Sequence, residues 1–216
     1  MTGVTLQDGA SLETIPDMEA LRALIGQPGS GPIKKDIGRI DEHFAAFIAH
    51  SPFVLLATAA ADGTCDVSPR GDGAGFVRVL DASHIAIPER PGNKRLDSLS
   101  NIMETKRAGL LFMIPGFDDT LRMNGEAALT TDPALLAEMA VDGKEPKLAI
   151  ILTVEEAYLH CAKAFRRSHL WEPDAYLDRS ELPSAGCMYR DQMGITDVPA
   201  EVIDANLEKS NREDLY

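Results

Sequence analysis

The sequence lacks the features that mark several classes of protein. It has 3 cysteines in 216 residues, Cys65, Cys161 and Cys187, and an odd number of widely spaced thiols predicts neither a disulfide framework nor a zinc site. No run of about 18 apolar residues occurs, and the first residues form neither a basic nor an apolar leader. We therefore expect a soluble protein, without membrane contact, in the reducing cytoplasm.

Positive charge is also scarce. The 21 lysines and arginines are outnumbered by 34 aspartates and glutamates, which gives a formal net charge of -13. A nucleic-acid surface needs a basic stripe that neutralises phosphates, so this composition argues against one. The basic pairs Lys34–Lys35, Lys94–Arg95 and Arg166–Arg167 are local islands. Each suits a small phosphate or carboxylate better than a polymer.

Common catalytic signatures are missing as well. The sequence contains no HExxH, GxSxG or P-loop pattern, so the chemistry that those motifs carry is not expected. His43 and His50 have no acidic third ligand at a metal-site spacing, and we predict no metal site. His160 and Cys161 lack the flanking pattern of a Cys–His nucleophile.

What the sequence does contain is a series of short β-prone runs separated by turns. With few helices between them, such runs are typical of an antiparallel barrel. The strands are expected at 53–59, 65–70, 77–80, 84–88, 107–114, 120–126 and 147–161, and helices at 18–25, 37–48, 132–139 and 199–210. We predict one mainly β (α+β) domain with flanking helices. It has an N-terminal helical arm at 1–35, a barrel at 44–160 and a C-terminal extension at 161–216.

The segment 90–99 carries the most chemical information. Apolar residues recur at helical spacing after a Pro-Gly-Asn turn, so we predict a helix capped by Asn93. Lys94 and Arg95 would then lie in its first turn, where cations oppose the helix macrodipole. A bound anion would reverse that conflict, which favours a phosphate site, whereas the alternative is a solvated basic turn.

Two strands are expected to offer an arginine on a polar face. Alternation places Asp66, Ser68 and Arg70 on one face of the first strand, and Thr120 and Arg122 on one face of the other. Both faces are available to a ligand. Exposed cross-strand charge, which is common in antiparallel sheets, is the alternative.

The order of these features resembles the flavin mononucleotide (FMN) binding split barrel of the pyridoxamine 5′-phosphate oxidase superfamily. In that superfamily a strand arginine, a strand before the phosphate loop, an Arg/Lys pair, a helix with Leu-x-x-Asn and a strand ending in x-Gly follow one another. The matching positions, within residues 44–130, are Arg70, Ile87–Pro88, Lys94–Arg95, Leu96–Asn101 and Arg122–Gly125.

The resemblance implies an antiparallel split β-barrel that forms a homodimer with FMN at the subunit interface. Lys94 and Arg95 would clamp the FMN phosphate, and Arg70 would reach the phosphate or the ribityl and ring region. The residues that the resemblance assigns to the cofactor are Ser68, Pro69, Arg70, Ile87, Pro88, Asn93, Lys94, Arg95, Thr120 and Arg122.

A second resemblance lies after the barrel. The stretch 160–171 matches the motif His-Cys-x-Lys-Ala-x-x-Arg-Ser-x-Leu-Trp of a subgroup of FMN-dependent proteins in this superfamily. It implies that Arg167 and Trp171, contributed by the partner chain, form a substrate-facing wall. The alternative makes Trp171 a core anchor and the arginines a solvated face.

A flavin supplies most of the chemistry itself, so few catalytic side chains are needed. The resemblance therefore implies an FMN-dependent oxidoreductase that acts on a small organic molecule, with NAD(P)H as one candidate electron donor. A flavin-binding carrier, sensor or storage module is the alternative, and deazaflavin or haem in place of FMN is a third. Vitamin B6 oxidation is not expected, because the C-terminal substrate-arginine motif of those oxidases is not evident.

Overall fold

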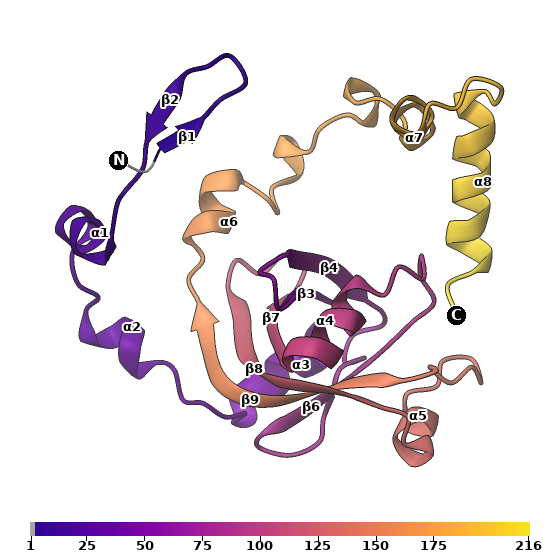
Figure 1. The fold of residues 1–216 in the computed structure, drawn as a ribbon. Coiled ribbons are helices and arrows are strands. Elements are labelled where there is room, and N and C mark those ends of the chain that lie inside the picture. The colour runs from indigo at the N-terminus through magenta and orange to yellow at the C-terminus, as the bar shows by residue number, and fades with distance from the viewer. Residues whose placement is uncertain (1–2) are drawn as a thin grey trace. The chain divides into compact units, whose positions relative to one another are not determined.

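Alternating apolar residues build an antiparallel sheet of seven strands in the part of the chain after residue 36 (Figure 1). The computed structural model describes residues 3–216. The strand order is β4-β3-β7-β8-β9-β6-β5. The strands are β3 (Phe53–Ala59), β4 (Cys65–Gly71), β5 (Arg78–Val79), β6 (His84–Pro88), β7 (Arg107–Met113), β8 (Thr120–Thr130) and β9 (Ala149–His160). Every expected strand is present, and the mainly antiparallel α+β fold is confirmed.

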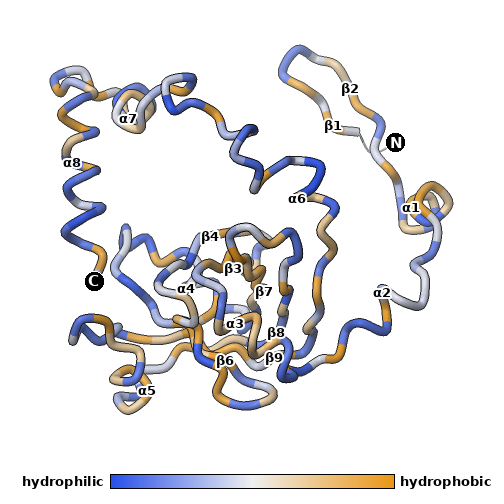
Figure 2. The backbone as a smooth tube through the Cα atoms, turned by 180° about the vertical axis from the view of Figure 1, so that it is seen from behind, coloured by the Kyte–Doolittle hydropathy of each residue, from blue (hydrophilic) through white to orange (hydrophobic). Residues whose placement is uncertain are grey.

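The core lies on the inner face of this sheet. Every second residue of the central strands is buried there, and Phe112 is the largest fully buried side chain. Helix α4 (Asp97–Thr105) closes the core with Leu99 and Ile102, and Asn101 Nδ2 donates to Thr58 Oγ1 over 3.0 Å. Figure 2 shows the hydrophobic residues gathered in the strands. Burial of this apolar face is the main stabilising term of the fold.

A bulge bends the two longest strands. Asn124 pairs with Glu156 and Gly125 with Val154, so Glu155 is the extra residue on β9. A Cβ at Gly125 would lie 1.9 Å from the Thr153 carbonyl oxygen, and only glycine fits there. The bulge lets the strands coil around the core.

Further helices occur after residue 36. They are α3 (Glu42–His50), α5 (Pro133–Glu138), α6 (Lys163–Ser168), α7 (Ala185–Met193) and α8 (Ala200–Glu213), with short 3₁₀ turns at Pro173–Ala175 and Arg179–Glu181. The helix predicted at 37–48 is present as α3, but it begins at Glu42, so the predicted start was wrong. Asp41 caps α3 by accepting from Phe44 N over 2.9 Å, and residues before it bond elsewhere: Ile40 N donates to Ala82 O. Helix α7 was not predicted.

The part of the chain before residue 37 is a separate unit. It holds a two-stranded ribbon, β1 (Gly3–Thr5) with β2 (Ser11–Glu13), and the helices α1 (Met18–Ile25) and α2 (Ser30–Lys34). Helix α1 has the predicted bounds, because Asp17 accepts from Ala20 N and Gly26 ends the helix with φ 87°. None of its residues is buried.

The sheet does not close on itself. Strand β4 is one edge, and β5 with only two residues is the other. Among residues 3–216 no helix is long and apolar enough to cross a membrane.

Candidate functional site

Strand β4 presents polar side chains to α4. Asp66, Ser68 and Arg70 are half-buried, whereas the residues between them are exposed. The alternation agrees with the sequence-based prediction. The polar face, however, does not face open solvent. It lies against the helix that follows the basic loop.

Ser98, near the start of α4, connects this face to the helix. Its hydroxyl donates to Asp66 Oδ2 over 2.5 Å and lies 2.9 Å from Ser68 Oγ. Ser98 is 3% exposed, and sequence reasoning missed it. The available signal was spacing, because Ser98, Ile102 and Thr105 share one helix face at i, i+4 and i+7.

Arg70 is the least satisfied side chain of the group. Its Nη1 pairs with Glu89 Oε2, and its Nη2 makes two long contacts, 3.4 Å to Ser68 Oγ and 3.3 Å to Ser98 Oγ. Its Nε is buried and has no hydrogen-bond partner among the described residues. A guanidinium has five N–H donors. Arg70 therefore has donor capacity left for a further acceptor.

The basic loop differs from the predicted helix start. Helix α4 begins at Asp97, not at Lys94, and Leu96 is its N-cap with φ 63°. The Asn93 side chain accepts from Arg95 N over 2.9 Å, which forms a local turn instead of a helix cap. Asp97, not a cation, occupies the first turn, so the macrodipole argument for an anion does not hold.

The two cations of the loop lie just outside the helix. Arg95 Nε bonds Asp97 Oδ2 over 2.8 Å, and both side chains are largely exposed. The hydrogen bond and charge of Asp97, with a contribution from Asp66, raise the pKa of Arg95. Lys94 is exposed, has φ 60° and forms no ion pair within residues 3–216. The structure thus brings Arg95 near the Asp66 end of the β4 face.

The remaining predicted cofactor residues lie elsewhere. Ile87 and Pro88 are buried in β6, and Thr120 is 2% exposed. Arg122 is exposed on β8, where its guanidinium carbon lies 5.6 Å from the centre of the Tyr158 ring. Among the described residues, no side-chain hydrogen bond or ion pair joins any of these residues to the Arg70 group.

Pro69 and Arg122 share the outer face of the sheet. Register places Leu55 and Leu111 between them on the intervening strands, so the two are about 14 Å apart. Ser68 and Arg70 point to the opposite face. Within one chain, the residues predicted to bind the cofactor therefore lie on both faces of the sheet.

Trp171 anchors the segment after β9 to the turn between β7 and β8. Its Nε1 donates to Phe117 O over 2.8 Å, and its ring lies 5.8 Å from that of Phe165. Arg166 pairs with Asp118 over 3.1 Å. Arg167 is exposed and makes no ion pair in the described part of the chain. Within one chain, Trp171 thus packs against Phe165 and is bonded to the β7–β8 turn.

Two ion pairs bridge the open side of the sheet. Arg70 pairs with Glu89, and Arg90 Nε bonds Asp72 Oδ2 over 2.7 Å. They join the end of β4 to the residues after β6, and four strands lie between β4 and β6 in the sheet. We call Arg70, Asp72, Glu89 and Arg90 the seam.

Tyr216 covers the Asp72 end of the seam. Its hydroxyl donates to Asp72 Oδ1 over 2.7 Å, and Arg90 lies over its ring at 5.4 Å. Burial raises the pKa of Asp72, but hydrogen bonds from Tyr216, Gly73 N and Arg90 outweigh it, so the net pKa is lowered. The bond to Asp72, followed by burial, raises the pKa of Tyr216.

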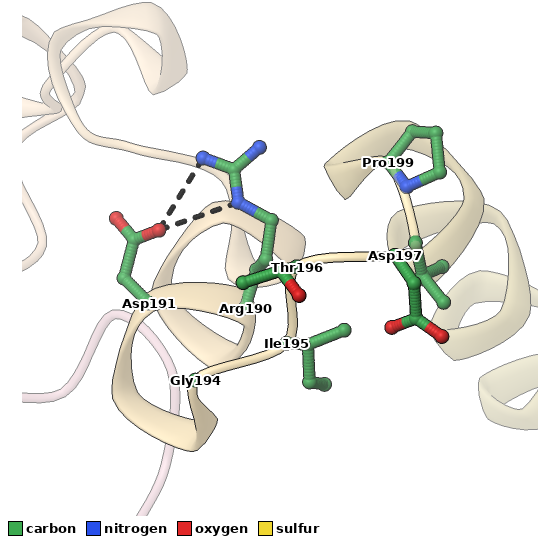
Figure 3. A pocket seen from close by; sticks show the side chains of 8 residues that line it. Arg190, Asp191, Gly194, Ile195, Thr196, Asp197 and Pro199 are labelled. Carbon is green, nitrogen blue, oxygen red and sulfur yellow. Dashed lines mark hydrogen bonds and ion pairs between the residues drawn. The ribbon is translucent and has the colours of Figure 1, made fainter.

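Two cavities lie outside this group. One of about 610 Å³ is formed by the end of α7 and the loop before α8, where Arg190 pairs with Asp191 (Figure 3). The other, of about 550 Å³, is an apolar groove along α4 that includes Leu96, Met103 and Leu148. Neither was predicted. Residues 3–216 hold no cluster of three or more metal-ligating side chains.

The comparisons with known proteins agree with this fold. A family model described as pyridoxamine 5′-phosphate oxidase matches residues 40–161. No curated protein matches the chain.

Several solved structures are similar over the barrel. A Lactobacillus delbrueckii protein is 22% identical, with 57% of this chain and 98% of that chain covered and a TM-score of 0.45. HupZ from Group A Streptococcus is 20% identical, with 56% and 93% covered and a TM-score of 0.44. An FMN-binding protein from Syntrophomonas wolfei is 12% identical, with 53% and 81% covered and a TM-score of 0.42. These scores are too low for the likeness to bear on function.

Proposed function

The chain belongs to the pyridoxamine 5′-phosphate oxidase family, and from this premise we propose that it binds FMN and acts as an FMN-dependent oxidoreductase on a small organic molecule. Vitamin B6 oxidation is not part of the proposal, because the substrate-arginine motif of those oxidases is not evident in the sequence.

The observation that carries the proposal is the incomplete bonding of Arg70. Its buried Nε has no partner and its Nη2 makes only long contacts. A phosphate monoester offers several strong acceptor oxygens, which matches this deficit in kind and in charge. The donor set therefore fits the phosphate end of FMN.

Lys94 and Arg95 would complete the phosphate clamp. Arg95 would exchange its exposed pair with Asp97 for the phosphate, and exposed pairs contribute only about 0–1 kcal/mol. Lys94 has no pair to give up among the described residues. The turn that Asn93 closes contains both cations, and Arg95 lies near enough to Asp66 of β4 to feel its charge.

The other assigned residues would act in different ways. Ser68 and Pro69 would line the flavin through backbone groups of the edge strand β4. The buried Ile87, Pro88 and Thr120 can likewise offer only backbone groups. The residues on the outer face, or beyond it, would approach a cofactor bound to the second copy of a homodimer. They are Arg122, Arg167 and Trp171. Exposed apolar residues on that face, such as Val67 at 63% exposure, support burial by a second copy.

When bound, FMN supplies the hydride and electron transfer, and the chain supplies binding, orientation and exclusion of water. The alternative function is a flavin carrier, sensor or storage module, which the same binding residues would serve equally well. The two differ in whether the bound flavin is reduced and reoxidised by small molecules.

Binding is tested with a Lys94→Ala/Arg95→Ala double variant. We expect FMN affinity to fall at least tenfold, or about 1.4 kcal/mol, while riboflavin affinity is unchanged, because only FMN carries the phosphate. Fluorescence titration with each flavin measures both constants. Lys34→Ala/Lys35→Ala is the matched control on another basic pair. An FMN affinity within about twofold of wild type would remove this phosphate site.

Turnover and assembly are tested on the flavin-loaded protein. Stopped-flow absorbance should show the flavin reduced by NADH or NADPH and reoxidised by a small acceptor. Light scattering should give twice the 23.4 kDa chain mass. A flavin inert to nicotinamides, small acids and quinones would favour the carrier or sensor. A single-chain mass with FMN bound would exclude an interfacial site.

A further inference from the structure

We propose that Glu89 is an internal competitor for the anion position at Arg70, so that Glu89 sets the affinity of the site for phosphate. This inference rests on the proposed function, because it concerns the same arginine. The Glu89 carboxylate bonds Arg70 Nη1, which is the one ion pair of this guanidinium among the described residues. An incoming phosphate would bond the same guanidinium, whose charge Glu89 already neutralises. Two anions at one guanidinium repel each other, so phosphate binding displaces Glu89.

The two ion pairs of the seam differ in how firmly they are held. The Asp72 carboxylate is 5% exposed and accepts from Arg90, Tyr216 and the Gly73 N–H. Arg90 also donates to Met139 O over 2.9 Å. Glu89 is 22% exposed, and Arg70 is its one side-chain partner among the described residues. The Arg90–Asp72 pair is therefore firmly held, whereas Glu89 can leave Arg70 and be replaced by another anion.

Glu89 can leave Arg70 without a change of the main chain. Its N–H donates to Leu148 O over 3.0 Å, which fixes the backbone at the end of β6. Only its side-chain torsions need to change, and its partial exposure gives the released carboxylate access to water. Arg90 and Asp72 keep the two strand ends together in the meantime.

Charge determines the outcome of the exchange. A phosphate monoester carries about −1.5 to −2 charges near pH 7 and three acceptor oxygens, against one charge and two oxygens for Glu89. It can thus use the Nη2 and Nε donors that Glu89 leaves poorly bonded. Displacement of Glu89 opposes phosphate binding, while a flavin without phosphate avoids it.

The test is Glu89→Gln, which keeps the shape and removes the charge. We expect FMN to bind at least about fivefold more tightly and riboflavin to bind unchanged, so the ratio of the two affinities rises. Inorganic phosphate should also raise the melting temperature of Glu89→Gln more than that of wild type. Glu155→Gln is the matched control, because it breaks another Arg–Glu pair, with Arg107, outside the site.

The outcomes separate this inference from the proposed function. Wild-type protein that does not bind FMN refutes the proposed function, and inorganic phosphate then decides the inference alone. An unchanged or lower FMN-to-riboflavin ratio in Glu89→Gln shows that Glu89 only joins the strands, and overturns the inference. If Glu89→Gln does not fold, Glu89→Asp replaces it. The shorter side chain weakens the Arg70 contact, so the same rise, smaller in size, is expected.

Discussion

The interior of the sheet is held by apolar side chains and strand hydrogen bonds, whereas the seam is held by charges. Phe112, Leu121 and Met123 are fully buried between strands that pair along their lengths. At the seam no strand pairing joins β4 to β6, and two ion pairs take its place. A polar ligand cannot bind among these buried apolar side chains, because its polar groups would have no hydrogen-bond partners there. The seam contains Arg70, whose partner Glu89 can exchange, and this is where we propose that the barrel binds its cofactor.

The largest expected effect lies in the interior. Phe112→Ala should lower the free energy of unfolding by about 3–5 kcal/mol, because it removes a buried ring and leaves a cavity. Urea denaturation measures the loss. It should be the same at low and high salt, since no charge is involved. A loss of unfolding free energy that depends on salt would show that charges also stabilise the interior, as they do the seam.

The next effect lies at the seam. Asp72→Asn should cost about 2 kcal/mol, because it removes the charge that compensates a nearly buried Arg90. Asp191→Asn is the control, since it alters an exposed pair between neighbouring residues and should cost under about 0.5 kcal/mol. Equal losses in the two variants would mean that the seam contributes no more than the surface.

The interior could be predicted from the sequence, whereas the seam could not, because different forces stabilise them. The interior shows in the sequence because alternation along β3, β7 and β8 is a local pattern, and all seven strands were predicted. The seam pairs residues 19 and 18 positions apart, and Tyr216 reaches Asp72 over 144 positions. Nothing in local spacing reports such contacts.

The candidate site was predicted only in part. The order of features led to Arg70 and to the Lys94–Arg95 loop, but the helix start was placed too early because Asn93 bonds Arg95 N instead of capping the helix. The roles of Ser98 and Glu89 depend on which strand the helix packs against and on which strand ends meet. Those are properties of the fold, not of any one segment.

The smallest expected effect concerns Tyr216 and depends on pH. Tyr216→Phe should cost about 1 kcal/mol at neutral pH by removing the bond to Asp72. The pKa of Asp72 is lowered from its ordinary value of 3.8, so the ionised carboxylate is favoured in the folded state. The contribution of the ionised Asp72 carboxylate to stability is present above pH 3.8 and is lost as the pH falls through the lowered pKa.

The difference between wild type and Tyr216→Phe should therefore be constant around neutrality and shrink in acid below the pKa of free aspartate. Urea denaturation of both proteins over a pH series measures it. Tyr189→Phe, at an exposed tyrosine of α7, should show no difference at any pH. A constant gap down to the most acid pH would show that Asp72 is not the partner that matters.

The open side of the sheet has a kinetic consequence. Parting β4 from β6 breaks side-chain contacts only, since the strand order places no hydrogen-bonded ladder between them. We therefore expect β4 and β6 to part without loss of strand pairing, while the backbone amides of β3 and β7 stay protected from hydrogen exchange. Because ion pairs join the two strand ends, we expect such an opening to increase with salt concentration. A cofactor could enter and leave through it while the rest of the fold stays rigid.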